Sequence, residues 1–238
     1  MGARSENPER RNSVGTASFD GFPRETLSFL RGLARNNRRD WFEANRQRYE
    51  EHVVEPAFAF IRAMAPRLRR VSPQLQAIPK KVGGSLGRIH RDVRFSKDKT
   101  PYDTHVGIYF KHAEARRTPA PGVGLHLGPE GVFLGAGLWA PDTKTLGRIR
   151  DAIVADPKAW GRVRAKLEPR DDRLVRPPRG YPADHPCVED LKLKSFVVET
   201  ERKASAMHSA GFADEAGEFF LSARPLLRYL CKALDVPS

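Results

Sequence analysis

The chain has 238 residues, which is long enough to bury a sizeable hydrophobic core in one large domain or two small ones. It carries 42 Lys and Arg residues against 29 Asp and Glu residues, giving a formal net charge of +13 and a pI near 10.1. Cys187 and Cys231 are too few for a disulfide scaffold, and no apolar run approaches the roughly 20 residues of a membrane helix. We therefore expect a cytoplasmic protein, with no membrane association, whose basic surface either attracts polyanions or is simply solvated.

Residues 1–18 contain Arg, Asn, Ser and Glu but no apolar segment, which excludes a secretory signal and predicts a disordered leader. We expect a single domain over residues 19–238. Its first helix should begin at Pro23, because proline suits the first helical turn, and should end near Asn36-Asn37. The apolar residues of its buried face are Leu27, Leu30 and Leu33.

A longer helix should follow, with Asn37 as its cap and Asp40 at the third position. Apolar residues then recur at steps of three, four or seven, which indicates one buried stripe. These residues are Phe42, Tyr49, Val53, Phe60, Met64 and Leu68. Pro56 falls within the stripe and should kink or split the helix, and Pro66 is expected in its last turn.

The middle of the chain changes from helical to alternating periodicity. Gly83-Gly84-Ser85 breaks the chain, and strands are expected over 86–93 and 106–110, on either side of a charged segment. Two further alternating runs, 123–127 and 132–138, flank a Gly-Pro-Glu-Gly sequence, which predicts a hairpin.

Helical periodicity returns after Pro141. The apolar residues of two successive stripes are Leu146, Ile149 and Ile153, then Trp160, Val163 and Leu167. Five prolines between Pro169 and Pro186 indicate an extended surface loop, residues 193–199 a late strand, and residues 214–234 a terminal helix. Helices, then strands, then helices predict an α+β fold, with a mainly antiparallel sheet packed against N-terminal and C-terminal helices.

The fifteen residues from Arg88 to Tyr102, hereafter the charged loop, contain five cationic side chains, one histidine and two carboxylates. Burying so many charges without partners would be costly, so the loop is expected to face solvent and to bind an anion. Arginine and lysine suit phosphate or carboxylate groups. The candidate anion-binding residues are Arg88, Arg91, Arg94, Ser96, Lys97, Lys99 and Tyr102, with Asp92 and Asp98 as carboxylates that orient them.

Three functions remain open for this loop. The first is binding of an anionic, phosphate-bearing ligand or of nucleic acid, whose backbone can be bound through charge alone. The second is an enzyme that acts on a small phosphorylated or carboxylated substrate and uses the same cluster to stabilise transition-state charge. The third is a structural clamp, in which Asp92 and Asp98 neutralise Arg91, Arg94 or Lys99.

Other chemistries have weaker support. Residues 96–99 match the S-x-x-K pattern of some serine acyl-enzymes, but Pro101 follows at once and the S-D-N and K-T-G motifs are absent. His90, Asp92 and His105 are possible metal ligands, but the surrounding cations would oppose a divalent ion. We therefore predict no metal and no cofactor, and the sequence identifies neither a catalytic residue nor an oligomeric state.

Glycines also mark the predicted hairpin. Gly135 and Gly137 lie on the strand face that carries Phe133 and Trp139, where they predict either a shallow floor for a ligand or close packing of a helix. His126 is expected to face solvent or a helix. Large aromatics are mostly buried, so Trp41 is assigned to the core, with Phe42 beside it.

Three blocks of residues together resemble the bacterial and fungal family known as domain of unknown function 2461. The blocks are Phe29-Leu30 with Asn36-Asn37, Trp41-Phe42 and Tyr49; residues 88–99 with Pro101-Tyr102; and residues 135–141 with Leu146 and Ile149-Arg150. The resemblance extends from about Phe19 to the C-terminal helix. It implies a single α+β domain, and it implies no particular reaction. Asp103 stands where a basic residue would be more typical of the family.

Overall fold

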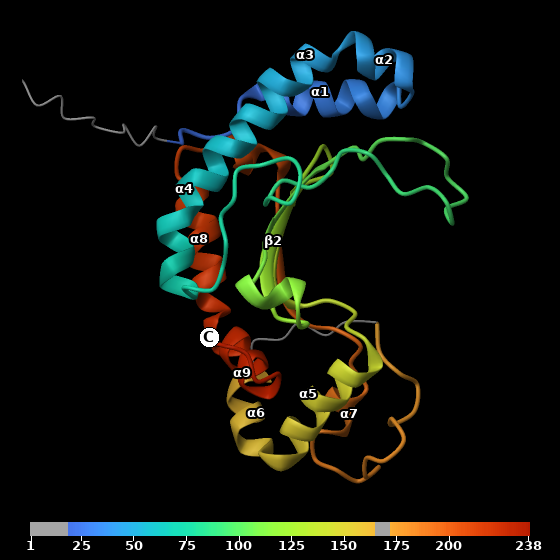
Figure 1. Cartoon of the computed structure of the whole chain (residues 1–238), viewed down its shortest axis with the longest axis vertical. Helices are drawn as coiled ribbons and strands as arrows, with labels where there is room; N and C mark the ends of the chain where they lie inside the picture. Colours follow the sequence, from blue (N-terminus) through green and yellow to red (C-terminus); the bar gives the residue numbers. More distant parts are fainter. Residues whose placement is uncertain (1–18, 165–171) are drawn as a thin grey trace, which may run out of the picture.

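The computed structural model describes residues 19–164 and 172–238, and Figure 1 shows their course. The predicted leader, Leu167 and Pro169 lie outside the described residues. The helical elements are α1 (Arg24–Arg35), α2 (Arg39–Ala44), α3 (Arg46–Tyr49), the π-helix η1 (Glu50–Val54), α4 (Glu55–Val71), the 3-10 helix η2 (Ala113–Arg116), α5 (Thr143–Ala155), α6 (Pro157–Arg164), α7 (Val188–Leu191), the 3-10 helix η3 (Ala204–His208), α8 (Phe212–Ser222) and α9 (Arg224–Ala233).

The strands are β1 (Val106–Phe110), β2 (Gly122–Leu127), β3 (Val132–Leu138) and β4 (Phe196–Arg202). Within the described residues they form one antiparallel sheet in the order β1-β2-β3-β4. The prediction of an α+β fold with an antiparallel sheet is therefore confirmed. The predicted hairpin is β2 and β3, whose turn is closed by hydrogen bonds between Gly128 and Gly131.

A proline shapes the N-terminal helices. The predicted long helix is split at Asn45, between α2 and α3, and not at Pro56. At Pro56 the helix stays continuous, with the π-helix η1 immediately before the turn that contains this proline. Pro56 has no N–H with which to bond the carbonyl of His52, four residues earlier. That carbonyl accepts a hydrogen bond of 2.6 Å from the hydroxyl of Thr26, which is buried on α1. The proline thus provides an acceptor that joins α1 to the following helix.

Several local predictions are wrong. Pro66 lies inside α4, which continues to Val71, and the N-cap of α2 is Arg38 rather than Asn37. The predicted terminal helix is two helices, α8 and α9, separated at Ala223. Pro225 in the first turn of α9 cannot donate a backbone hydrogen bond to α8, which explains the break.

The predicted strand over residues 86–93 is also wrong. Only isolated bridges form there, Leu86 with Ile108 and His90 with Tyr102, and the intervening backbone is irregular. The late strand is present as β4 and begins three residues later than predicted.

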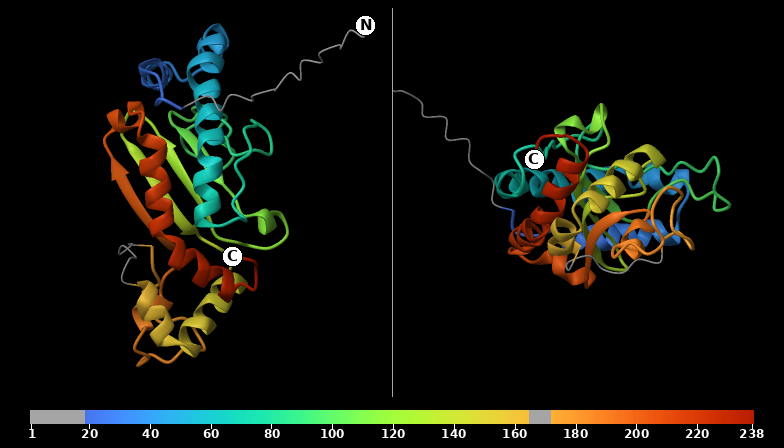
Figure 2. Two further views of the ribbon diagram at one scale, coloured as in Figure 1. Left: turned by 90° about the vertical axis from the view of Figure 1, so that its left-hand side faces the viewer. Right: turned by 90° about the horizontal axis from the view of Figure 1, so that it is seen from below.

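The two faces of the sheet differ. Helices α4 and α8 run side by side along one face, as Figures 1 and 2 show, and the inward-facing apolar residues of the strands pack there. The opposite face carries exposed aromatic and polar side chains and adjoins two hollows of the surface. We call it the open face.

The segment between β3 and β4 forms α5, α6 and α7 at one end of the sheet (Figure 1). The chain leaves at Leu138 and returns at Phe196, and these two residues are paired in the sheet. Trp160 of α6 is fully buried and its ring packs against Phe196 of β4 and Tyr229 of α9. The same buried core therefore extends from the sheet into this segment.

Candidate functional site

The charged loop extends from the edge of the sheet beyond β1, where it is drawn in green in Figure 1. Its two arms are joined at the base by backbone hydrogen bonds, from Arg91 to Pro101 (2.9 Å) and from Asp103 to Ile89 (2.8 Å). Ile89 is buried between exposed Arg88 and His90, so the loop is attached to the core by one apolar side chain on this arm.

Most charges of the loop neutralise one another. Arg94 forms a bidentate pair with Asp92, with nitrogen to oxygen distances of 2.9 and 2.6 Å. Arg91 bonds Asp98 at 2.5 Å and also the hydroxyl of Thr100. A backbone hydrogen bond from Thr100 and the pair with Arg91 lower the pKa of Asp98 to about 2. The two carboxylates therefore hold two of the predicted anion-binding arginines in an internal network.

Two further loop residues have partners that were not expected. Lys99 donates a 2.9 Å hydrogen bond to the carbonyl of Val93 and not to Ser96, so the S-x-x-K arrangement is not formed. Tyr102 is only 3% exposed and its ring stacks on Phe42 at 4.3 Å. Tyr102 is therefore a core residue rather than a ligand contact, and its buried ring anchors the end of the loop.

Asn37 holds this anchor in place. Its side-chain amide donates to the carbonyl of Tyr102 (2.8 Å) and accepts from the amide of Tyr102 (3.1 Å). The asparagine predicted to cap a helix thus connects the α1–α2 turn to the charged loop.

Arg88 faces a basic pocket, which we define by four cations and the turn that adjoins them. The pocket has a volume of about 410 Å³ and is lined by Lys81, Arg88, Lys111, Arg116 and residues 83–85, among others. Lys81 pairs with Glu50. Within the described chain, the other three cations form no ion pair, and no Asp or Glu lines the pocket.

A second hollow of about 330 Å³ lies between the charged loop and β1. It brings together Arg88, Arg91 and Asp92 of the predicted site, and it adds Asp103. Its two cations and two carboxylates balance, and Arg88 lines both this hollow and the basic pocket.

The open face of the sheet carries two rows of outward-pointing positions. One row, in register across the four strands, is Tyr109, Gly124, Gly135 and Glu199. The next row is Gly107, His126, Phe133 and Glu201. Apart from Gly107, these residues line two adjoining hollows of about 470 and 650 Å³. The hollows share His126 and Phe133, and together we call them the open-face cleft.

Glycines give this cleft its floor. A β-carbon added at Gly135 would lie 2.7 Å from the ring of Trp139, and one at Gly124 would lie 3.1 Å from the ring of Tyr109. The two rings therefore rest directly on the backbone. The ring of Trp139, and not a helix, packs on Gly135, so the prediction of close helix packing there is wrong.

Two histidines, His105 and His126, lie side by side in the cleft, next to Tyr109. His126 shares a hydrogen bond of 2.8 Å with the hydroxyl of Tyr109, and its ring stacks on His105 at 4.6 Å. Burial, and secondly the neighbouring His105, lowers the pKa of His126, so that a neutral imidazole is favoured. Burial raises the pKa of Tyr109. A neutral histidine next to a protonated tyrosine can accept or pass on a proton.

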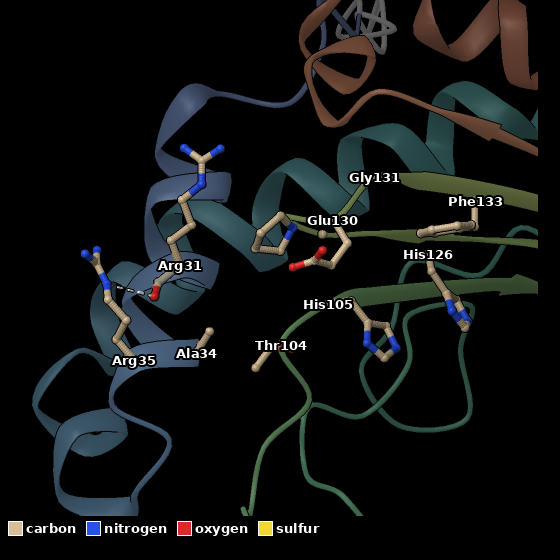
Figure 3. A pocket seen from close by; sticks show the side chains of 11 residues that line it. Arg31, Ala34, Arg35, Thr104, His105, His126, Glu130, Gly131 and Phe133 are labelled. Atoms are coloured by element: carbon tan, nitrogen blue, oxygen red, sulfur yellow. Dashed lines mark hydrogen bonds between the residues drawn. The ribbon is translucent and has the colours of Figure 1, made fainter.

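The helical wall of the cleft is α1. In Figure 3, Arg31, Ala34 and Arg35 of this helix lie across the hollow from His105 and His126. Glu130, in the β2–β3 turn, lies between the two sides (Figure 3). His105 lines this cleft and also, with His90 and Asp92, the hollow beside the charged loop. In the described part of the chain, no group of three His, Cys, Asp or Glu side chains is arranged to hold a metal.

A comparison with protein families gives one match that covers most of the chain. The model of a conserved hypothetical protein family, DUF2461, matches residues 25–229. The chain belongs to the DUF2461 family. The DUF2461 match covers the charged loop, the basic pocket and all four strands, and the resemblance noted in the sequence is confirmed. No curated protein and no solved structure matches the chain. Helices that could cross a membrane are absent from the described residues.

Sequence reasoning missed several residues of these candidate sites. Tyr109, Glu199 and Glu201 were not singled out, although they occupy outward positions of alternating strands. Their common face becomes visible only with the register of four strands. Lys111 and Arg116 were missed because they lie more than twenty residues after the glycines they meet.

Proposed function

We propose that the protein binds a phosphate-bearing ligand in the basic pocket. The observation that carries this proposal is the group of three cations, Arg88, Lys111 and Arg116, around one hollow whose described lining has no carboxylate. Charge-assisted hydrogen bonds to phosphate are about twice as strong as neutral ones, and arginine can form them in pairs.

The glycine turn supports the same ligand chemistry. Gly83 has a φ of +68°, and a side chain at Gly84 would collide with the carbonyl of Lys80. Among the described residues, the N–H groups of Val82, Gly83 and Gly84 have no acceptor. Successive free N–H groups in a turn of this kind are suited to anion binding.

The charged loop has a different part in this proposal. Its arginines at 91 and 94 are already paired with carboxylates, which supports the clamp function considered from the sequence. Arg88 is the member of the predicted cluster that lines the basic pocket. Nucleic acid is one possible source of the phosphate, and inorganic pyrophosphate is the simplest probe of the shared chemistry.

The test is calorimetric titration of the full-length protein with pyrophosphate at about 50 mM salt, a concentration at which charge-driven binding is strong. We expect Arg116→Ala, and separately Lys111→Ala, to weaken binding by about tenfold each, the loss expected for one charged hydrogen-bonding partner. Lys97→Ala is the matched control, because it removes one charge from an exposed site that lines none of the described hollows.

Two outcomes would contradict the proposal. One is the absence of pyrophosphate binding to the wild-type protein at low salt. The other is an equal loss of affinity in Lys97→Ala, which would show that the whole basic surface attracts the anion. A single-stranded DNA oligonucleotide in the same titrations separates nucleic acid from small phosphates as the preferred partner.

A further inference from the structure

We propose that the open-face cleft, which shares Tyr109 with the lining of the basic pocket, is a second binding site, for a small planar molecule that carries a cationic amino group. The lining of this site differs from that of the basic pocket, because its walls are aromatic and its charged residues are negative. It occupies the part of the cleft between Tyr109, Trp139 and strand β4.

Aromatic rings form the walls of this part. Tyr109, Phe133 and Trp139 are 38%, 43% and 42% exposed, and they are three of the large apolar side chains that the described surface leaves in contact with water. All three line the same hollow. Because Gly124 and Gly135 have no side chains, the rings of Tyr109 and Trp139 lie against the backbone. The hollow beside these two rings stays open for a flat ligand. Aromatic faces also attract cations.

Carboxylates supply the charge. Glu199 and Glu201 are alternate residues of β4, so both point to the open face. The indole N–H of Trp139 donates to Glu199 at 3.1 Å, which holds this carboxylate beside the aromatic wall. No Lys or Arg is among the described residues lining this part, and the histidine there favours its neutral form. The hollow therefore has a negative lining in a protein of net charge +13.

The size of the hollow agrees with a small molecule. Its volume of about 650 Å³ lies within the range of pockets that bind ligands of drug size. A fused bicyclic ring with one amino group can pack against the aromatic walls of this hollow and direct that group towards β4.

The experiment compares two rings of the same shape and opposite charge. The probes are 4-aminoquinoline, which is cationic at neutral pH, and quinoline-4-carboxylate, each titrated calorimetrically into the full-length protein. We expect the cationic probe to bind at least about tenfold more tightly, corresponding to one favourable charge interaction in a partly buried site. Equal or tighter binding of the carboxylate, or no binding of either probe, would overturn the proposal.

Variants then locate the site. Glu201→Gln and Glu199→Gln keep the size of the side chain, and each should weaken binding of 4-aminoquinoline by about fivefold to tenfold. The matched control is Glu218→Gln on α8, which covers the other face of the sheet. If both cleft variants bind the probe as tightly as the control does, the proposal is wrong. Pyrophosphate binding should be unchanged in all three, so that failure of this proposal is distinguishable from failure of the first.

Discussion

At the scale of single residues, His126 lies where several interactions of the open-face cleft meet. Its ring meets the hydroxyl of Tyr109 and the ring of His105, and the carboxylates of Asp103 and Glu199 act on it from the loop and from β4. Burial and His105 lower its pKa, whereas the two carboxylates raise it, and the lowering prevails.

This balance predicts a pH dependence of stability. The folded protein binds a proton at His126 less readily than the unfolded chain, whose histidine pKa is near 6.5. As the pH falls through this value the unfolded state takes up the proton first, so the contribution of His126 to stability is lost at lower pH. Titration of the imidazole by NMR should give a midpoint below 6.5, and His105→Asn should move it upwards.

A midpoint of His126 at or above its ordinary value would contradict this prediction. Tyr109→Phe provides the control for the hydrogen bond. Removing the phenol hydroxyl should leave the burial of the ring in place, and therefore most of the shift.

At the scale of elements, the charged loop is positioned by Asn37 of the α1–α2 turn. Asn37→Ala removes two hydrogen bonds to the backbone of Tyr102 and leaves a partly buried N–H and C=O without partners. We expect the free energy of unfolding to fall by about 1–3 kcal/mol. Urea denaturation measures this change, and hydrogen exchange of residues 88–102 should become faster.

Asn45→Ala is the appropriate comparison. The amide of Asn45 donates to the carbonyl of Trp41 within its own helical turn, so its loss should leave exchange in the charged loop unchanged. If Asn37→Ala affects the loop no more than this control does, Asn37 does not anchor it.

The elements also show what a sequence can predict. The helix with Leu27, Leu30 and Leu33 and the hairpin around Gly128 follow from local periodicity, and both are confirmed. Residues 86–93 were predicted as a strand because they follow a glycine break and precede a polar turn. They pair only in isolated bridges, and the turn that follows is held by the ion pairs Arg91–Asp98 and Arg94–Asp92, which periodicity does not record.

The candidate sites, too, could be predicted from the sequence only in part. Arg88 and the unusual charge of its loop are evident from composition, and Gly135 with Trp139 from alternation. The basic pocket and the open-face cleft depend on contacts between distant segments, such as Gly83 with Arg116, and on which sheet face the helices cover. No local pattern specifies that choice.

At the scale of the whole molecule, the buried side chains predict one cooperative unit. Trp160 packs on β4 and α9, and its indole N–H donates to buried Asp190 at 2.9 Å. The single domain expected over residues 19–238 should therefore unfold in one step. Tryptophan fluorescence and far-ultraviolet circular dichroism should give coincident urea transitions, as they do for two-state proteins.

Two separated transitions would contradict the single domain. Asp190→Ala sharpens the test, because it leaves the buried indole N–H of Trp160 without its acceptor. We expect it to lower both transitions together by about 1–3 kcal/mol. A change confined to the fluorescence transition would show that α5, α6 and α7 unfold independently.

The paired exit and return of the chain at Leu138 and Phe196 have an evolutionary consequence. A segment whose two ends are neighbours in a sheet can lengthen, shorten or be exchanged while the strands keep their register. Gene-level insertions and deletions are therefore better tolerated between these two positions than within the β2–β3 turn. Homologues of different length should differ mainly there, and they should keep the face that carries Tyr109 and Glu199.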